Sequence, residues 1–75
     1  MDERTEHHDR LNPVVEDILD RVTAGDFARM PERIGTRAMR AWLRLMANPH
    51  SHTAPADARY IKLALIGSML WEPVA

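Results

Sequence analysis

Cysteine is absent from this 75-residue sequence, and glycine (3 residues) and aromatic residues (5%) are scarce. The lack of cysteine excludes a disulfide framework, thiol catalysis and zinc sites of the cysteine type. Gly25, Gly35 and Gly67 are isolated, so they form no glycine-rich loop that could cradle a phosphate. These absences remove disulfide, thiol, cysteine–zinc and phosphate-loop chemistry from the range of functions.

Long hydrophobic runs and a strong net charge are also absent. The longest apolar stretch, residues 60–71, is interrupted by Lys62 and Ser68 and is too short to cross a membrane. The formal net charge is −1, which makes attraction of the whole molecule to nucleic acid weak. The chain opens on the polar sequence MDERTEHHDR and not on a basic leader with an apolar core. We therefore expect a cytoplasmic protein that does not enter a membrane.

The hydrophobic content is sufficient for one small domain. Hydrophobic residues make up 45% of the chain, which excludes compositional disorder. A domain of this size buries only about 60–65% of the surface that its unfolded chain exposes. A partner or self-association would therefore stabilise it considerably. Residues 1–11 lack apolar periodicity, so we expect a frayed or disordered segment there and a single helical domain over residues 12–75.

Turn and cap residues predict the first helices. Asn12-Pro13 is a helix start, and apolar spacing predicts a helix over 13–24 that Gly25 ends in a left-handed turn. Within a continuous helix over 27–47, Pro31 and Gly35 would cost about 3 and 1 kcal/mol relative to alanine. We therefore predict a short helix near 26–30, capped by Asp26. A main helix then starts between 31 and 36, with Thr36 as one candidate cap, and ends near Ala47.

The last predicted helix, over residues 55–71, is apolar nearly all the way round in its second half. A helix of this kind normally lies at the centre of its fold, and two amphipathic helices cannot fully cover it. We therefore predict an all-α bundle of three main helices with one extra short turn. We expect it to form a homo-oligomer through the C-terminal helix, and a homodimer is one such assembly. The candidate residues for apolar association are Met69, Leu70 and Trp71.

An arginine row is the main candidate for binding. Five arginines recur at steps of four, four, three and four residues, within an arc of roughly 80° on a helix: Arg29, Arg33, Arg37, Arg40 and Arg44. If the chain breaks near Pro31, Arg29 leaves this row. The candidate residues for electrostatic contact are then Arg33, Arg37, Arg40 and Arg44. Guanidinium groups bind carboxylates and phosphates through a fork of donors.

Three interpretations of this row remain open. The arginines could face solvent or the acids of the first helix, Glu16, Asp17 and Asp20. They could bind an acidic protein surface, or they could contact the phosphates of nucleic acid as a basic helix after a short turn does. The formal net charge is −5 over residues 1–26 and +4 over residues 27–75. The acidic N-terminal segment therefore opposes phosphate binding. The helix also lacks the Asn, Gln and Ser that usually accompany arginine in base reading.

Metal binding and catalysis have little support in the sequence. The histidines occur as two pairs, and no HExxH motif or acid cluster completes a metal site around either of them. Ser51, Thr53 and Asp57 resemble a nucleophile and a base, but a chain this short leaves little room for a pocket and an oxyanion hole. We expect surface histidines, no metal, no cofactor and no enzymatic activity. The histidine pairs are His7-His8 and His50 with His52.

These observations together predict a non-catalytic module for protein–protein interaction. Such a module would be an adaptor, an inhibitor or a regulatory subunit that docks on a larger protein with an acidic surface. The size and composition suit a small accessory protein of a bacterium or a phage. The alternative is a small DNA- or RNA-binding regulator that uses the same arginine-lined helix on phosphates.

Overall fold

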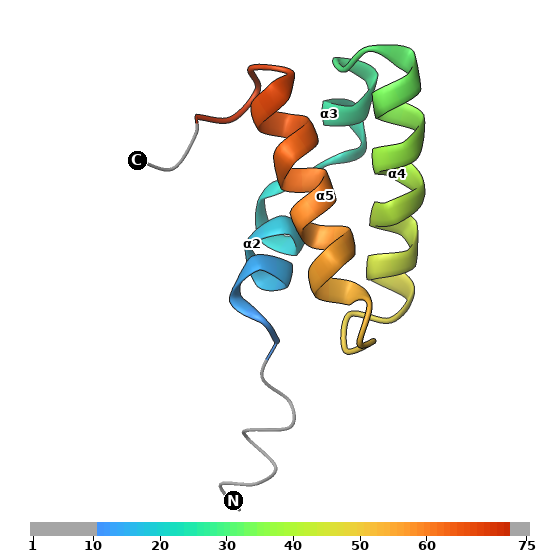
Figure 1. Ribbon diagram of the computed structural model, residues 1–75, viewed down its shortest axis with the longest axis vertical. Coiled ribbons are helices and arrows are strands. Elements are labelled where there is room, and N and C mark those ends of the chain that lie inside the picture. Colours follow the sequence, from blue (N-terminus) through green and yellow to red (C-terminus); the bar gives the residue numbers. More distant parts are fainter. Residues whose placement is uncertain (1–10, 73–75) are drawn as a thin grey trace, which may run out of the picture.

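The computed structural model describes residues 11–72, and Figure 1 shows how its helices are arranged. Over this range the chain contains no strand and forms four helices: α2 (Pro13–Arg21), α3 (Ala24–Ala28), α4 (Glu32–Ala47) and α5 (Ala54–Gly67). The prediction of an all-α bundle with three main helices and one extra short turn is confirmed. Leu11, which we expected to be frayed, packs against the core. The rest of the expected N-terminal disorder, residues 1–10, lies outside the described residues.

Helix α5 occupies the centre of the bundle, as its apolar sequence predicted. It packs against α4 on one side and α2 on the other, whereas α3 packs against α4. Figure 1 shows α5 running between α2 and α4. Because α5 separates these two helices, the acidic side chains of α2 and the arginines of α4 lie on different parts of the surface.

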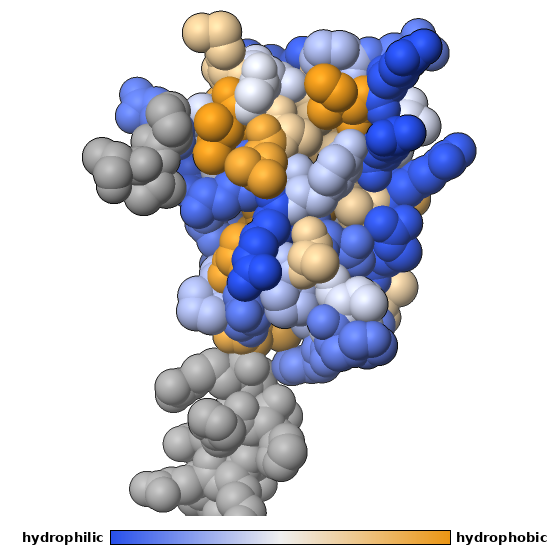
Figure 2. Space-filling view, in the orientation of Figure 1, coloured by the Kyte–Doolittle hydropathy of each residue, from blue (hydrophilic) through white to orange (hydrophobic). Residues whose placement is uncertain are grey.

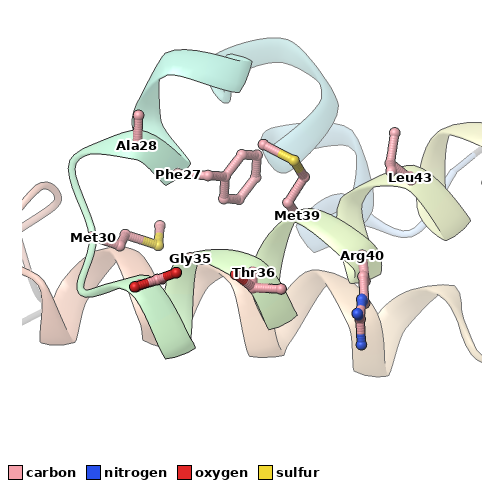
Figure 3. A pocket seen from close by; sticks show the side chains of 9 residues that line it. Phe27, Ala28, Met30, Gly35, Thr36, Met39, Arg40 and Leu43 are labelled. Carbon is pink, nitrogen blue, oxygen red and sulfur yellow. The ribbon is translucent and has the colours of Figure 1, made fainter.

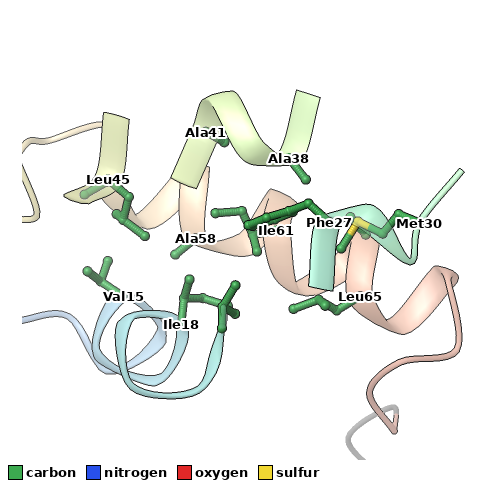
Figure 4. Close-up of a cluster of buried hydrophobic side chains, with 13 residues drawn as sticks. Val15, Ile18, Phe27, Met30, Ala38, Ala41, Leu45, Ala58, Ile61 and Leu65 are labelled. Carbon is green, nitrogen blue, oxygen red and sulfur yellow. The ribbon is translucent and has the colours of Figure 1, made fainter. Parts of the chain in front are cut away.

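The core between α4 and α5 is built largely from alanine. Five of the buried core residues are alanines, and all five belong to these two helices. Small side chains let two helix backbones approach closely, while the larger residues of α2 fill the opposite side of α5 (Figure 4). No charged residue of the described range is buried. The core consists of Val15, Ile18, Val22, Phe27, Met30, Ala38, Ala41, Leu45, Ala54, Ala58, Ile61, Ala64 and Leu65.

Helix α2 begins where the sequence predicted and ends earlier. The Asn12 side chain caps it, because its Oδ1 atom accepts a hydrogen bond from the Val14 amide at 2.9 Å. The predicted end at residue 24, with Gly25 in a left-handed turn, is wrong. The helix ends at Arg21, and no glycine of the described range has a positive φ. Val22 leaves the helix in an extended conformation (φ −89°, ψ 138°) because its side chain is buried in the core.

The short helix α3 lies two residues earlier than predicted. Thr23, not Asp26, is the residue at its N-terminal boundary. Asp26 lies inside the first turn, and its Oδ2 atom accepts a hydrogen bond from the Thr23 amide at 2.9 Å. Because α3 ends at Ala28, Arg29 does not belong to the helix that carries the other arginines. The row on α4 therefore starts at Arg33.

Helix α4 starts directly after Pro31, within the predicted interval, but Thr36 does not cap it. Gly35 and Thr36 lie inside the helix, and the Gly35 amide donates a hydrogen bond to the Pro31 carbonyl oxygen at 2.8 Å. Gly35 is buried, and a Cβ atom at this position would lie 2.5 Å from the carbonyl oxygen of Phe27. Glycine is therefore required for contact with α3 and does not interrupt the helix. Beside this contact, the Phe27 ring lies against Trp42, with ring centroids 5.3 Å apart.

Helix α5 ends at Gly67, four residues before the predicted end at Trp71. Ser68 follows the helix, and Met69 takes the left-handed conformation with φ 61°. The Met69 amide donates to the Ile66 carbonyl at 3.0 Å, and the Leu70 amide donates to the Leu65 carbonyl at 2.9 Å. These two hydrogen bonds define a Schellman motif, in which the left-handed residue is usually glycine. The turn directs Leu70 and Trp71 back towards the core.

Two of the helical glycines, Gly25 and Gly35, give opposite predictions. Gly25→Ala should raise the free energy of unfolding by about 0.4–1 kcal/mol, because alanine restricts the unfolded chain and the new Cβ meets only Thr23 Oγ1, at 3.8 Å. Gly35→Ala should lower it by about 1–3 kcal/mol, because the Cβ would collide with the Phe27 carbonyl. Urea denaturation of both variants and the wild type measures this difference. Equal effects at the two positions would contradict the close α3–α4 contact.

Candidate functional site

The candidate site is the exposed arginine face of α4. Helical spacing places Arg33, Arg37, Arg40 and Arg44 on the side opposite the buried residues Ala38, Ala41 and Leu45. All four arginines are exposed. In Figure 2, hydrophilic side chains line the edge of the molecule that α4 forms, and hydrophobic ones gather nearer α5. The structure thus brings the four predicted arginines together on one surface.

Arg44 differs from the other three arginines because it has a partner inside the fold. Its Nη2 atom lies 3.0 Å from Oδ1 of Asp57, a residue in the first turn of α5. A surface ion pair of this kind contributes about 0–1 kcal/mol. The pair links α4 to α5 and neutralises much of the charge of Arg44. Arg44 therefore contributes less to an anion-binding surface than the sequence indicated.

Arg33, Arg37 and Arg40 form no ion pair with any other residue between 11 and 72. Of the first interpretation, pairing with the acids of α2 is wrong for the described residues, whereas exposure of the row to solvent is confirmed. Asp17 is paired instead with Arg21 of its own helix, at 3.2 Å. The reason is the position of α5, which lies between α2 and α4. These three guanidinium groups are exposed, which leaves them accessible to a carboxylate or phosphate from another molecule.

A groove between α3 and α4 borders this arginine face. We call it the α3–α4 groove; it has a volume of about 430 Å³, and its main apolar walls are Phe27, Met30, Met39 and Leu43 (Figure 3). Arg40 lines this groove and also lines two shallow hollows on the arginine face. Sequence reasoning did not find this groove, because its walls come from two helices that meet only through tertiary packing. The sequence signal of a close approach here is Gly35, a single glycine within the helical pattern of α4.

The residues predicted for apolar association do not share one face. Leu70 and Trp71 are half-buried against the core, and the guanidinium carbon of Arg21 lies 3.9 Å from the centre of the Trp71 ring. This distance is typical of a cation–π contact. Met69 is the exception, with 90% of its surface exposed. Self-association through this end of α5 stays a prediction.

The histidines and hydroxyl groups near α5 lie in a surface loop. His50 and His52 are exposed, and the described residues contain no group of three or more metal-binding side chains. The hydroxyl oxygens of Ser51 and Thr53 lie 3.0 Å apart and hydrogen-bond to each other ahead of α5. The pair His7-His8 lies outside the described residues. In this loop the hydroxyl pair belongs to a local turn, and the arginine face is the stronger candidate for binding.

Comparison with known proteins gives no family for this chain. No protein-family model, curated protein or solved structure matches it. Among the helices between residues 11 and 72, none has the length and hydrophobicity that a membrane span requires. The arginine face of α4 and the α3–α4 groove are the surface features that bear on its function.

The left-handed methionine after α5 can be tested by substitution. Met69→Gly should raise the free energy of unfolding by about 1 kcal/mol, because a side chain at φ 61° is strained and this one is almost fully exposed. Met46→Gly is the matched control, since Met46 is also exposed but lies inside α4, where glycine should cost about 1 kcal/mol. Chemical denaturation measures both changes. A loss of stability in Met69→Gly would show that the methionine side chain makes a stabilising contact.

Proposed function

We propose that this protein is a small non-catalytic interaction module that docks on an acidic surface of a larger protein. The observation that carries the proposal is the exposed trio Arg33, Arg37 and Arg40, which has no ion-pair partner among residues 11–72. Arginine is suited to this role because its fork of donors binds a carboxylate in two places. The module would act as an adaptor, an inhibitor or a regulatory subunit.

The spacing of the trio supports binding to an ordered acidic segment. Arg33, Arg37 and Arg40 lie on successive turns of α4 and span about 10 Å along the helix axis, at 1.5 Å per residue. Carboxylates at similar helical spacing on a partner would meet them in register. Tyr60 of α5 lies beside Arg37 and Arg40 in one of the shallow hollows. Tyrosine and arginine are both enriched among the residues that dominate protein–protein binding energy.

Nucleic acid is the alternative partner, because phosphates could occupy the same guanidinium groups. The groove is the specific feature that favours a protein. An apolar groove of about 430 Å³ adjoins Arg40, and apolar contacts of this extent are not needed to follow a phosphate backbone. Thr36 is the one uncharged polar side chain among the exposed residues of α4, so the helix has little capacity for base reading.

Charge reversal on the arginine face should abolish recovery of the natural partner. The test compares tagged wild-type protein with the double variant Arg33→Glu/Arg37→Glu as bait in an extract of the source cells, with mass spectrometry as the readout. We expect an acidic protein that the wild type retains and the variant loses, because two attractive contacts become repulsive. Its recovery should also fall as salt is raised.

The matched control is Arg29→Glu/Arg59→Glu. It changes the net charge by the same amount at two exposed positions away from the row on α4. This variant should retain the acidic protein. Equal losses in both double variants would mean that overall charge, and not the arginine face, governs binding. Equal recovery by the wild type and the α4 variant would overturn the proposed function.

Titration with duplex DNA separates the two partners. We expect no saturable binding at about 50 mM salt, where phosphate contacts are strongest. Fluorescence anisotropy of a labelled duplex measures this directly, with a second titration at about 200 mM salt. If tight binding at low salt disappears at the higher salt and also in Arg33→Glu/Arg37→Glu, the nucleic-acid alternative replaces the protein partner.

A further inference from the structure

The α3–α4 groove is an apolar hollow beside the arginine face, and its lining indicates what kind of segment would dock there. We infer that the groove binds one large apolar side chain of a short acidic segment of the partner protein, while a neighbouring carboxylate of that segment meets Arg40 and Arg37. This inference rests on the proposed function and adds to it a chemical description of the bound segment.

The walls of the groove are apolar and come from both helices. Phe27 and Met30 are buried at its α3 side, while Met39 and the exposed Leu43 stand on α4. Gly35 also lines the groove, near the start of α4 and close to the Phe27 carbonyl (Figure 3). An occupant would therefore touch hydrocarbon and thioether groups on both sides. Covering the exposed Leu43 and the half-buried Met39 removes apolar surface of both molecules from water, whereas Phe27 and Met30 are already buried within the fold.

The groove is a concave and largely apolar hollow with room for a large side chain and part of the adjoining backbone. Its volume of about 430 Å³ lies within the range of roughly 300–1,000 Å³ that is typical of binding pockets. Two of its walls, Met30 and Met39, are methionines, whose flexible and polarisable side chains adapt to apolar groups of different shape. The groove should therefore accept leucine, methionine or an aromatic residue as the anchor.

The charges at the groove determine where the carboxylate of the segment must lie. Arg40 lines both the groove and the hollow that contains Arg37, and its guanidinium points away from the Phe27 ring (Figure 3). Glu32 also lines the groove, at the N-terminal end of α4, and would repel a second carboxylate there. An acidic group is thus favoured next to Arg40 and disfavoured next to Glu32. The acidic residue of the bound segment should therefore lie on the Arg40 side of its apolar anchor.

Selection from a displayed library of random short peptides tests the inference and does not require the partner to be identified first. The enriched peptides should pair a large apolar residue with Asp or Glu within about one helical turn. One enriched peptide is then titrated into protein carrying ¹³C-labelled methionine methyl groups. The methyl signals of Met30 and Met39 should shift, whereas those of Met46 and Met69, which do not line the groove, should stay in place.

A pair of glutamate substitutions on α4 compares a position at the groove with a control position outside it. Leu43→Glu places a carboxylate at the mouth of the groove, and Met46→Glu places one on the same helix outside it; the two native side chains are 52% and 46% exposed. Leu43→Glu should weaken the binding of the selected peptide on the order of tenfold or more, equivalent to about 1.4 kcal/mol. Met46→Glu should change it less than about twofold.

The outcomes separate this inference from the proposed function on which it rests. If Arg33→Glu/Arg37→Glu abolishes binding but Leu43→Glu does not, the groove is not the docking site and the arginine face still is. If Leu43→Glu abolishes binding but the arginine variant does not, the groove binds an apolar segment without the acidic surface, and the proposed function fails. Absence of any enriched peptide, or enrichment without an apolar anchor, overturns the inference.

Discussion

The close passage of the Phe27 carbonyl over Gly35 is the contact that fixes how α3 meets α4. Because Gly35 has no side chain, the backbone at the end of α3 can lie directly on the first turns of the long helix. This contact holds Phe27 against Trp42 and leaves Met30 buried beside them. It also turns the chain so that Arg29 is excluded from α4. Both the groove and the start of the arginine face depend on this arrangement.

The central position of α5 determines what the charged surfaces can do. The sequence places its acids in the first half and most of its basic residues in the second, so internal neutralisation was one open interpretation. With α5 between α2 and α4, the described structure contains one ion pair between helices, Arg44 with Asp57. The other pair, Arg21 with Asp17, lies within α2. Arg33, Arg37 and Arg40 therefore stay exposed, with no ion pair to any residue between 11 and 72.

The sequence predicted helix starts better than helix ends. Asn12 with Pro13 marks the start of α2, and Pro31 marks that of α4, through local chemistry: a cap accepts backbone hydrogen bonds and proline fixes φ. The ends at Arg21 and Gly67 depend on burial of Val22, Leu70 and Trp71, which is a tertiary effect. The arginine face was predictable because it follows helical periodicity. The groove was not, because no local pattern describes a surface shared by two helices.

The alanine-rich contact between α4 and α5 has a consequence for how this protein can change over time. Alanines and one leucine on the inner side of α4 hold it in the bundle, while three of the four outward arginines make no ion pair within residues 11–72. Substitutions on the outer side can therefore alter charge and shape at little expense to folding. The inner side tolerates almost no increase in volume. Under the proposed function, partner choice and fold stability would be encoded on opposite sides of one helix, and selection could act on the first while the second stays constant.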